Sequence, residues 1–268
     1  MEIVLVHIGT KLPAHIYDCV AQIKSKSELP IVLITDSSVC IDGVEVKEVA
    51  TPKDTFLEGF WAHTFNRLKV LSEHMTRAPK KPVLHIENDV LIYHDPLEYA
   101  NVFSDIAKGR VLMTSLGNDH LSAAYTYAPT SKSMGILWVE LCKHMGMGQK
   151  ELVKHTGYHF TSEMTLLDHI YKNHSGLIEL LPILRGDPHY DRFNSVFDPA
   201  SYGQYLGGIQ NAPGVAWAGD HHFIGKKINK GEILPVFEDG KPYATEGPDK
   251  YPINNLHIHS KQLKEFMG

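Results

Sequence analysis

The chain has 268 residues, of which 43% are hydrophobic and 21% charged, a composition typical of a globular protein and not of a disordered one. Its formal net charge of -5 provides no overall basic surface, so we expect neither nucleic-acid binding nor general adhesion to anionic membranes. Three widely spaced cysteines without metal-ligand spacing indicate buried thiols in a reducing cytoplasm, and no apolar run is long enough to span a membrane.

The first part of the chain has the pattern of a βαβ unit. Residues 2–8 form a continuous apolar run typical of a strand buried on both faces, residues 15–26 have helical spacing, and residues 29–36 form a second apolar strand. Such a unit predicts a parallel sheet with a ligand at the carboxyl ends of its strands. The polar residues expected at those ends are His7, Thr10, Lys11 and Asp36.

Strands and helices alternate through the middle of the chain. A short strand is expected at 44–49, and residues 54–75 have the spacing of a long amphipathic helix. The expected core positions of this helix are Phe56, Phe60, Phe65, Leu68 and Leu71. The other expected strands are 82–93, 107–116, 121–130 and 178–184, and the other expected helices are 131–146 and 161–176. The pattern predicts an α/β fold with a mixed, mostly parallel central sheet flanked by helices.

The last part of the chain has a different composition and little periodicity. Residues 186–250 contain many Gly, Pro, Asp and aromatic residues with little periodicity, so we expect long ordered loops around a site and not a separate domain. Residues 254–268 are expected to form a strand that passes into a short helix.

Two carboxylates interrupt the strand expected at 82–93. Glu87 and Asp89 are two residues apart, so on an extended strand both side chains point to one face, and the apolar pattern resumes directly after them. A pair of this kind suits a hard divalent cation such as magnesium or manganese, which takes oxygen ligands. The alternative is a solvated turn with two acids that bind no ion.

A second polar group stands near the end of the chain. In the segment LHIHSK, alternation places His257, His259 and Lys261 on one face. An imidazole can complete a metal shell, and a lysine can meet a diphosphate as a point charge. The chain has 17 histidines, most of which must be structural or solvated, so the indication comes from the grouping and not from any single histidine.

Three segments together resemble a known family. The strand that ends in Glu87-Asn88-Asp89, the segment FDPASYGQYLGG at 197–208 and the closing LHIHSK resemble the nucleotide-sugar-dependent glycosyltransferases of the GT-A fold, particularly small bacterial and large-virus members. The resemblance covers nearly the whole chain. It implies one GT-A-like domain at 1–268, in which 1–95 hold the donor and 96–268 hold the acceptor and the closing metal and diphosphate strand.

The resemblance implies the substrates as well. The donor would be a nucleoside-diphosphate sugar, with a UDP-sugar expected, and Mn²⁺ or Mg²⁺ would assist the transfer. The acceptor would be a hydroxyl group of a polysaccharide or other glycan, lipid-linked or protein-linked.

The resemblance further implies roles for the two polar groups. The fold's usual Asp-x-Asp motif has Glu87 in place of its first acid here, so Asp89 would bind the metal directly, while Glu87 would hold the metal, a bound water or the ribose. Either His259 or His257 would close the metal shell, and the pattern does not choose between them. Lys261 would steady the diphosphate.

Further donor contacts are implied along the chain. Thr10, Lys11 and Asp36 are candidates for the ribose and base, and Arg67 for the base or a phosphate. A surface or helix-capping position is the alternative for each of them. The full set expected to contact the donor is His7, Thr10, Lys11, Asp36, Arg67, Glu87, Asn88, Gln204 and Lys261.

Two acids are the catalytic candidates. Glu163 resembles, in its placement, the acid at a helix start in inverting members of the fold, where it would act as the general base. The alternative is that Glu163 only stabilises the helix N-terminus through the helix dipole. Asp198 is the second candidate, in the segment 197–208, whose glycines would let the loop move or approach a substrate closely.

Three other functions stay open. HIGTKLPAH is a weak match to the phosphate loop of a sugar nucleotidyltransferase, because His7 stands where a glycine is needed. LGNDH at 116–120 and GDHH at 219–222 imitate parts of a metal-dependent phosphoesterase pattern without its order. The third is a nucleotide-sugar binding protein without turnover.

Overall fold

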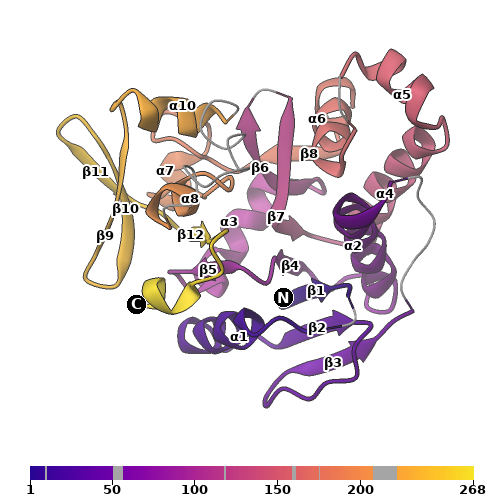
Figure 1. Ribbon diagram of the computed structural model, residues 1–268, viewed down its shortest axis with the longest axis horizontal. Coiled ribbons are helices and arrows are strands. Elements are labelled where there is room, and N and C mark those ends of the chain that lie inside the picture. Colours follow the sequence, from indigo (N-terminus) through magenta and orange to yellow (C-terminus); the bar gives the residue numbers. More distant parts are fainter. Residues whose placement is uncertain (10, 51–56, 118, 159–160, 175, 208–221) are drawn as a thin grey trace.

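The structure is a computed structural model that describes residues 1–9, 11–50, 57–117, 119–158, 161–174, 176–207 and 222–268. A seven-stranded sheet with the order β3-β2-β1-β4-β7-β6-β8 forms the centre of this described part (Figure 1). Four of its six strand pairs are parallel, and the two that involve β7 are antiparallel. The strands are β1 (Glu2–His7), β2 (Ile31–Thr35), β3 (Glu45–Glu48), β4 (Val83–Ile86), β6 (Val111–Gly117), β7 (His120–Ala128) and β8 (Ile178–Leu180). The predicted fold class, a mixed and mostly parallel sheet flanked by helices, is confirmed.

Successive residues of β1 belong to two separate hydrophobic cores. Ile3 and Leu5 share one core with α1 (His15–Lys26) and α3 (Ala100–Ala107). Val4 and Val6 belong to the other core, which contains residues of the helices α2, α4 and α6. Their bounds are Gly59–Thr76, Ser131–Met145 and Glu163–Asn173. Because side chains alternate across a strand, helices on both faces require the continuous apolar run that β1 has in the sequence.

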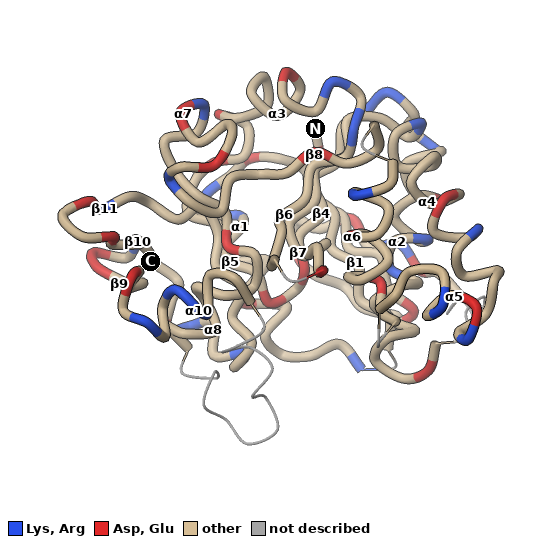
Figure 2. The backbone as a smooth tube through the Cα atoms, turned by 90° about the horizontal axis from the view of Figure 1, so that it is seen from above, with Lys and Arg blue, Asp and Glu red and all other residues tan. Residues whose placement is uncertain are grey.

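Shorter helical segments complete the described part, with α5 at its periphery (Figure 1). They are α5 (Gln149–Thr156), α7 (Tyr190–Phe193), α8 (Tyr202–Leu206) and α10 (Phe223–Asn229), with 3-10 turns at η1 (Pro96–Tyr99) and η3 (Leu263–Phe266). Basic and acidic residues are interspersed on the outer elements, for example on α5 (Figure 2). In the described residues, no helix is both long and apolar enough to cross a membrane.

The strand expected at 82–93 is two strands in the structure. The chain leaves the central sheet after β4, turns at residues 87–89, and continues as β5 (Val90–Ile92). β5 pairs antiparallel with β12 (Asn255–His257) in a small separate sheet. The expectation of one continuous strand is therefore wrong, because the backbone N–H of Val90 donates to the carbonyl of Glu87 at 3.0 Å and closes a turn there.

The segment 186–250 is more regular than expected. It contains most of a three-stranded antiparallel sheet, formed by β9 (Leu234–Glu238), β10 (Lys241–Glu246) and β11 (Asp249–Pro252). These strands bury few of their residues, and each contains a proline, so they lack the apolar alternation by which a half-buried strand is recognised. The expectation of loops alone is wrong for the described part of this segment.

The long helix also differs from its prediction. α2 begins at Gly59, and Phe56 lies outside the described residues. Phe65, Leu68 and Leu71 are buried as expected, but Phe60 is 68% exposed. Phe60 lies in the first turn of α2, where the helix borders a pocket and not the core, so its assignment to the core is wrong.

Candidate active site at the carboxyl edge of the central sheet

A pocket of about 460 Å³ lies at the carboxyl ends of β1 and β4, a volume within the usual range of small-molecule sites. Its walls come from the end of β1, the turn after β4, the first turns of α2, the start of α6 and the residues in and after β12. The predicted site residues that line it are His7, Arg67, Glu87, Asn88, Asp89, Glu163, His257, His259 and Lys261. Tertiary structure thus brings residues from both ends of the chain into one pocket.

Glu87, Asp89 and His257 form a group that fits a divalent cation. Each offers one ligand atom, and these atoms lie within 4.8 Å of one another. His257 Nε2 is 3.1 Å from Asp89 Oδ2 and 3.6 Å from Glu87 Oε2. Two carboxylates with one imidazole suit Mn²⁺, and the carboxylates alone suit Mg²⁺. Of the two late histidines, His257 is the one that belongs to this group.

Backbone pairing places His257 beside the acids. In the β5–β12 ladder, His257 stands opposite Val90, the residue that follows Asp89. The ladder continues past His257, because the backbone N–H of Ile258 donates to the carbonyl of Asp89 at 2.8 Å. The register of two short strands therefore determines which histidine meets the carboxylates.

Asp89 is held as an anion in the interior. It is 2% exposed, and burial alone would raise its pKa, but the charge and hydrogen bond of His257 and the charge of Lys261 outweigh burial and lower the pKa well below its usual range. Burial likewise opposes protonation of His257, yet Asp89 and then Glu87 raise the pKa of His257. Lys261 Nζ contacts Asp89 Oδ2 directly. The site is arranged around a buried negative charge that attracts cations.

A second charged group lies on α2 and α6. Arg67 Nη2 is 2.9 Å from Glu87 Oε1, and both side chains are mostly buried. Thr64, one turn before Arg67, donates its hydroxyl hydrogen to Glu163 Oε2 at 2.7 Å. Burial is the main influence on Glu163 and raises the pKa of its carboxyl group, against the opposing charge of Arg67. Glu163 is therefore a buried acid that can take up a proton more readily than an exposed one.

Glu163 is also the first residue of α6, whose N-cap is Ser162. The Ser162 hydroxyl accepts from the backbone N–H of Thr165 at 3.3 Å, and the Thr165 hydroxyl accepts from the backbone N–H of Ser162 at 2.9 Å. This reciprocal capping pairs the backbone N–H groups of Ser162 and Thr165 without the carboxylate of Glu163. The side chain of Glu163 is thereby available to the pocket.

A chain of hydrogen bonds fixes the opposite wall. His15 Nε2 lies 3.2 Å from Asn88 Oδ1, Asn88 Nδ2 lies 3.1 Å from His7 Nδ1, and His7 Nε2 lies 3.0 Å from the carbonyl of Lys11. One assignment satisfies all three contacts, with each ring Nε2–H donating and His7 Nδ1 accepting. Burial lowers the pKa of His7, which agrees with a neutral ring in that position. Asn88 is thereby held in one orientation in the pocket wall.

Asp198 lies outside the pocket lining and is fully buried. Its carboxylate accepts from four backbone N–H groups, those of Ser201 at 2.6 Å, Tyr202 and His257 at 2.9 Å, and Gly203 at 2.8 Å. Burial raises the pKa of Asp198 although the backbone donors of His257, Ser201 and Gly203 oppose it. These hydrogen bonds fasten the start of α8 to β12, and the side chain of Asp198, expected from the sequence to be catalytic, does not line the pocket.

Gln204 is a neighbour of the site and is not part of the pocket lining. It is fully buried, and its Nε2 lies 3.3 Å from His259 Nε2. The His259 ring stacks on the His257 ring, with the centroids 4.1 Å apart. Burial lowers the pKa of His259, so this ring is neutral. His259 therefore packs against His257 in the pocket wall, and Gln204 contacts His259 from outside the pocket.

Two further donor candidates, Lys11 and Asp36, are not part of the pocket lining. Lys11 is exposed, and Asp36 accepts from the backbone N–H of Gly9 at 2.8 Å, which orders the loop after β1. Thr10 and residues 219–221 of the GDHH segment lie outside the described residues. Asp119, from the LGNDH segment, pairs with Lys172 on α6.

Sequence reasoning missed several lining residues, above all His15, Trp61, His63 and Thr64. Thr64 stands three residues before Arg67, so helical spacing from that arginine was the available signal for it. His15 is the first residue of α1 and carried no signal of its own. Its contact with Asn88 joins residues 73 apart in the sequence.

No protein-family model and no curated protein matches the chain. It is similar in structure to several solved glycosyltransferases. The apo form of mouse xyloside xylosyltransferase 1 has 10% identity and a TM-score of 0.49, over 72% of this chain and 92% of that chain. The galactosyltransferase LgtC, in complex with donor and acceptor sugar analogs, has 14% identity and a TM-score of 0.47, over 89% of this chain and 98% of that chain. The glycosyltransferase GlyE of Streptococcus pneumoniae TIGR4 has 13% identity and a TM-score of 0.44, over 78% of this chain and 49% of that chain.

Proposed function

We propose that this protein is a divalent-metal-assisted glycosyltransferase that moves a sugar from a nucleoside-diphosphate sugar to a hydroxyl acceptor. The observation that carries the proposal is the group of Glu87, Asp89 and His257 with Lys261 against it, in a pocket at the carboxyl edge of the sheet. A metal group alone would also suit a phosphoesterase. The adjacent lysine favours a substrate that brings a diphosphate to the cation.

The charges of the pocket account for the chemistry. Cleavage of the sugar from the nucleotide builds negative charge on the leaving diphosphate, and a cation held by Glu87, Asp89 and His257 would stabilise that charge. Lys261 would add a second positive charge. This charge would speed the reaction because it binds the transition state, with its more negative diphosphate, more strongly than it binds the substrate. Its amine contacts Asp89 in this structure and would turn from that carboxylate toward the phosphate.

The N-terminal half would hold the nucleotide. Asn88 and His7 form a wall held rigid by hydrogen bonds, and Arg67 stands on the next wall. The exposed Phe60 and neighbouring Trp61 border the pocket and could stack on a flat base. We propose a UDP-sugar as the donor, with contacts from Thr10, Lys11 and Asp36 as part of the same proposal.

Glu163 is the group we propose as general base toward the acceptor hydroxyl. Its raised pKa and its place in the pocket lining support this role. The acceptor would be a polysaccharide or another lipid-linked or protein-linked glycan, held by the second half of the chain. We place the reaction in the cytoplasm, because the three cysteines, all in the described part of the chain, are widely spaced and form no disulfide.

A thermal-shift panel tests the donor site. UDP, GDP, CMP and dTDP would each be added with and without Mn²⁺. A ligand that binds only the folded state stabilises it by RT ln(1 + [L]/Kd), about 2.7 kcal/mol at a hundredfold excess over Kd. We expect one nucleotide, UDP, to raise the melting temperature only with Mn²⁺, and a response to none of the four would overturn the proposal.

A second measurement separates turnover from binding. Release of UDP from a UDP-sugar, followed with Mn²⁺ and after EDTA, would be expected to depend on the cation. A chain that binds UDP with Mn²⁺ but releases none from any UDP-sugar, with or without glycan acceptors, would instead be a nucleotide-sugar binding protein.

A further inference from the structure

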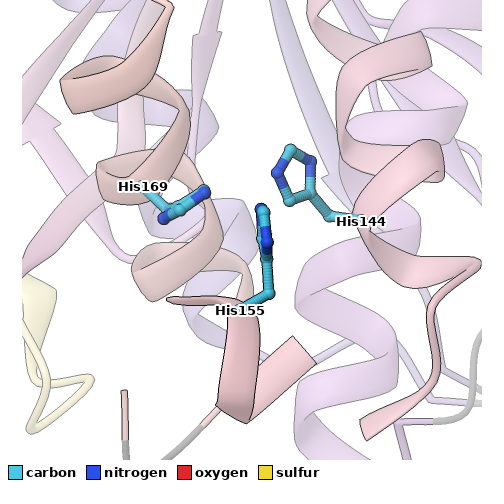
Figure 3. A group of neighbouring side chains, drawn as sticks. All are labelled: His144, His155 and His169. Atoms are coloured by element: carbon cyan, nitrogen blue, oxygen red, sulfur yellow. The ribbon is translucent and has the colours of Figure 1, made fainter. Parts of the chain in front are cut away.

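Three histidines from three helices face one another away from the pocket (Figure 3). His144 lies in the last turn of α4, His155 in the last turn of α5, and His169 on α6. Their ring centroids are 5.1 to 5.7 Å apart, and one ring nitrogen of each lies within 4.8 Å of the others. His144 and His169 are buried, while His155 is exposed. A cluster with one exposed member can be reached from solvent.

Hydrogen bonds orient two of the rings. His144 Nδ1 donates to the carbonyl of Glu140 at 2.8 Å, which leaves its Nε2 with a lone pair. The side-chain amide of Asn173 donates to the carbonyl of His169 at 2.8 Å, and the same Nδ2 lies 3.3 Å from His169 Nδ1, which fixes the position of this ring. For His144, a hydrogen bond on one ring nitrogen with the other nitrogen free is the arrangement by which proteins orient histidines that bind metal.

The surroundings leave the cluster open to a cation. Lys143 and Lys172, the nearby lysines on α4 and α6, pair with Glu140 and Asp168, each at 2.7 Å. His144 and His155 both lie at helix C-terminal ends, where the helix dipoles favour positive charge. The negative helix ends and the paired lysines both reduce repulsion of an incoming ion.

We propose that His144, His155 and His169 form a binding site for a borderline transition-metal ion such as Zn²⁺, separate from the pocket. Three imidazoles without a carboxylate suit Zn²⁺ and disfavour Mg²⁺, Ca²⁺ and Mn²⁺, which take oxygen ligands. Zn–N bonds of about 2.0–2.1 Å in a tetrahedral shell would bring the nitrogens to about 3.3 Å from one another. Small rotations of the rings, most easily that of exposed His155, would achieve this, with water in the fourth position.

Such an ion would fasten α5 to the rest of the fold. α5 is short and polar, and Leu152 is its fully buried residue. A metal that joins His155 to His144 and His169 would tie this helix to α4 and α6. Because α6 begins with Glu163 in the pocket, the ion would also steady the helix that carries that acid.

Calorimetric titration with Zn²⁺ of the full-length chain, stripped with EDTA and dialysed, tests the site. We expect His155→Ala to lose one Zn²⁺ equivalent, or to bind it about tenfold or more weakly, since losing a metal ligand costs at least as much as losing its supporting partner. Lys154→Ala, in the same turn of α5, is the matched control and should bind as the wild type does. Zn²⁺ should also raise the melting temperature of the wild type and the control by more than that of His155→Ala, which keeps only the pocket group.

His155 is exposed, so its substitution should leave the fold intact, and circular dichroism would verify this. The same number of Zn²⁺ ions bound with the same affinity by wild type and His155→Ala would overturn the proposal. So would the absence of Zn²⁺ binding to the wild type. Neither result would bear on the Mn²⁺-dependent nucleotide binding proposed for the pocket.

Discussion

His257 Nε2 lies 3.1 Å from Asp89 Oδ2, and Lys261 reaches the same carboxylate oxygen. One buried oxygen thus receives two cationic groups from the last segment of the chain. Burial of an acid is costly unless it is paired, so this arrangement persists because the partners compensate for the desolvation of Asp89. A divalent cation bound at Asp89 would compete with Lys261 for that oxygen and would leave the amine to meet a phosphate.

Asp89→Asn should remove most of the metal affinity of the pocket. The amide keeps the size of the side chain but loses the charge, and we expect Mn²⁺-dependent UDP binding to weaken by about tenfold or more, as one charge-assisted contact contributes roughly 1.5–3 kcal/mol. Calorimetry with Mn²⁺ and UDP measures this. Asp105→Asn, at an exposed acid that pairs with Arg192, is the control and should bind normally. Unchanged binding by Asp89→Asn would contradict the metal assignment.

Glu163→Gln should lower turnover and, at neutral pH, preserve or increase stability. Because burial raises the pKa of Glu163, the folded state holds this proton more tightly than the unfolded state does, and stability falls as pH rises from the ordinary value of 4.5 through the folded pKa. Glutamine carries no charge and can still accept from Thr64. The melting temperature of Glu163→Gln should therefore match or exceed that of the wild type at pH 7, with no such gain at pH 4.

The rate of the same variant distinguishes a base from a helix-capping acid. Loss of a general base should reduce UDP release by roughly 10²–10⁴-fold. Glu151→Gln, in the exposed first turn of α5, should leave the rate unchanged. If Glu163→Gln had a lower melting temperature at pH 7 and an unchanged rate of UDP release, the only role of Glu163 would be to stabilise the N-terminus of α6 through the helix dipole.

Gly203→Ala should disturb the metal group from outside the pocket. An added Cβ would lie 2.4 Å from the carbonyl oxygen of His257, a backbone atom that cannot move without β12. We expect a loss of about 1–3 kcal/mol of stability, typical of overpacking, together with weaker Mn²⁺ binding. Gly135→Ala, within α4, is the matched control, since a Cβ there meets nothing within 4 Å and should stabilise the helix by up to about 1 kcal/mol. Equal urea midpoints for the two variants would refute this close approach.

His85 should make the protein less stable in acid. Burial and, next, the charge of Arg67 lower the pKa of this histidine to about 4, from an ordinary 6.5. The unfolded state takes up the proton first, so stability is lost as pH falls from 6.5 to 4, by about 3 kcal/mol for this group. His85→Gln keeps a possible donor for the carbonyl of Val4, which His85 Nδ1 contacts at 2.9 Å.

Urea unfolding across this pH range would measure the effect of His85. The profile of His85→Gln should be flatter than that of the wild type. Parallel profiles for the wild type and His85→Gln would refute the lowered pKa.

Local patterns predicted the layered sheet because burial on both faces requires continuous apolar strands. Residues 2–8 and 29–36 show this pattern, and the helix expected at 15–26 has those bounds in the structure. Prediction from apolar patterns fails for elements that are not buried in this way. β9 to β11 bury few of their residues and carry no such pattern, and Phe60 has helical spacing but borders a pocket.

The sequence by itself determined the fold class and the acid pair, because strand and helix periodicity and the spacing of Glu87 and Asp89 are properties of neighbouring residues. Tertiary structure alone decided that His257 joins the acids, that His259 packs against His257, and that Gln204 contacts His259. It also decided that Asp198 binds backbone amides outside the pocket. The physical reason is that β5 pairs with β12 in one fixed register. The paired residues Ile92 and Asn255 are 163 residues apart in the sequence. No short-range pattern encodes which distant strands will pair.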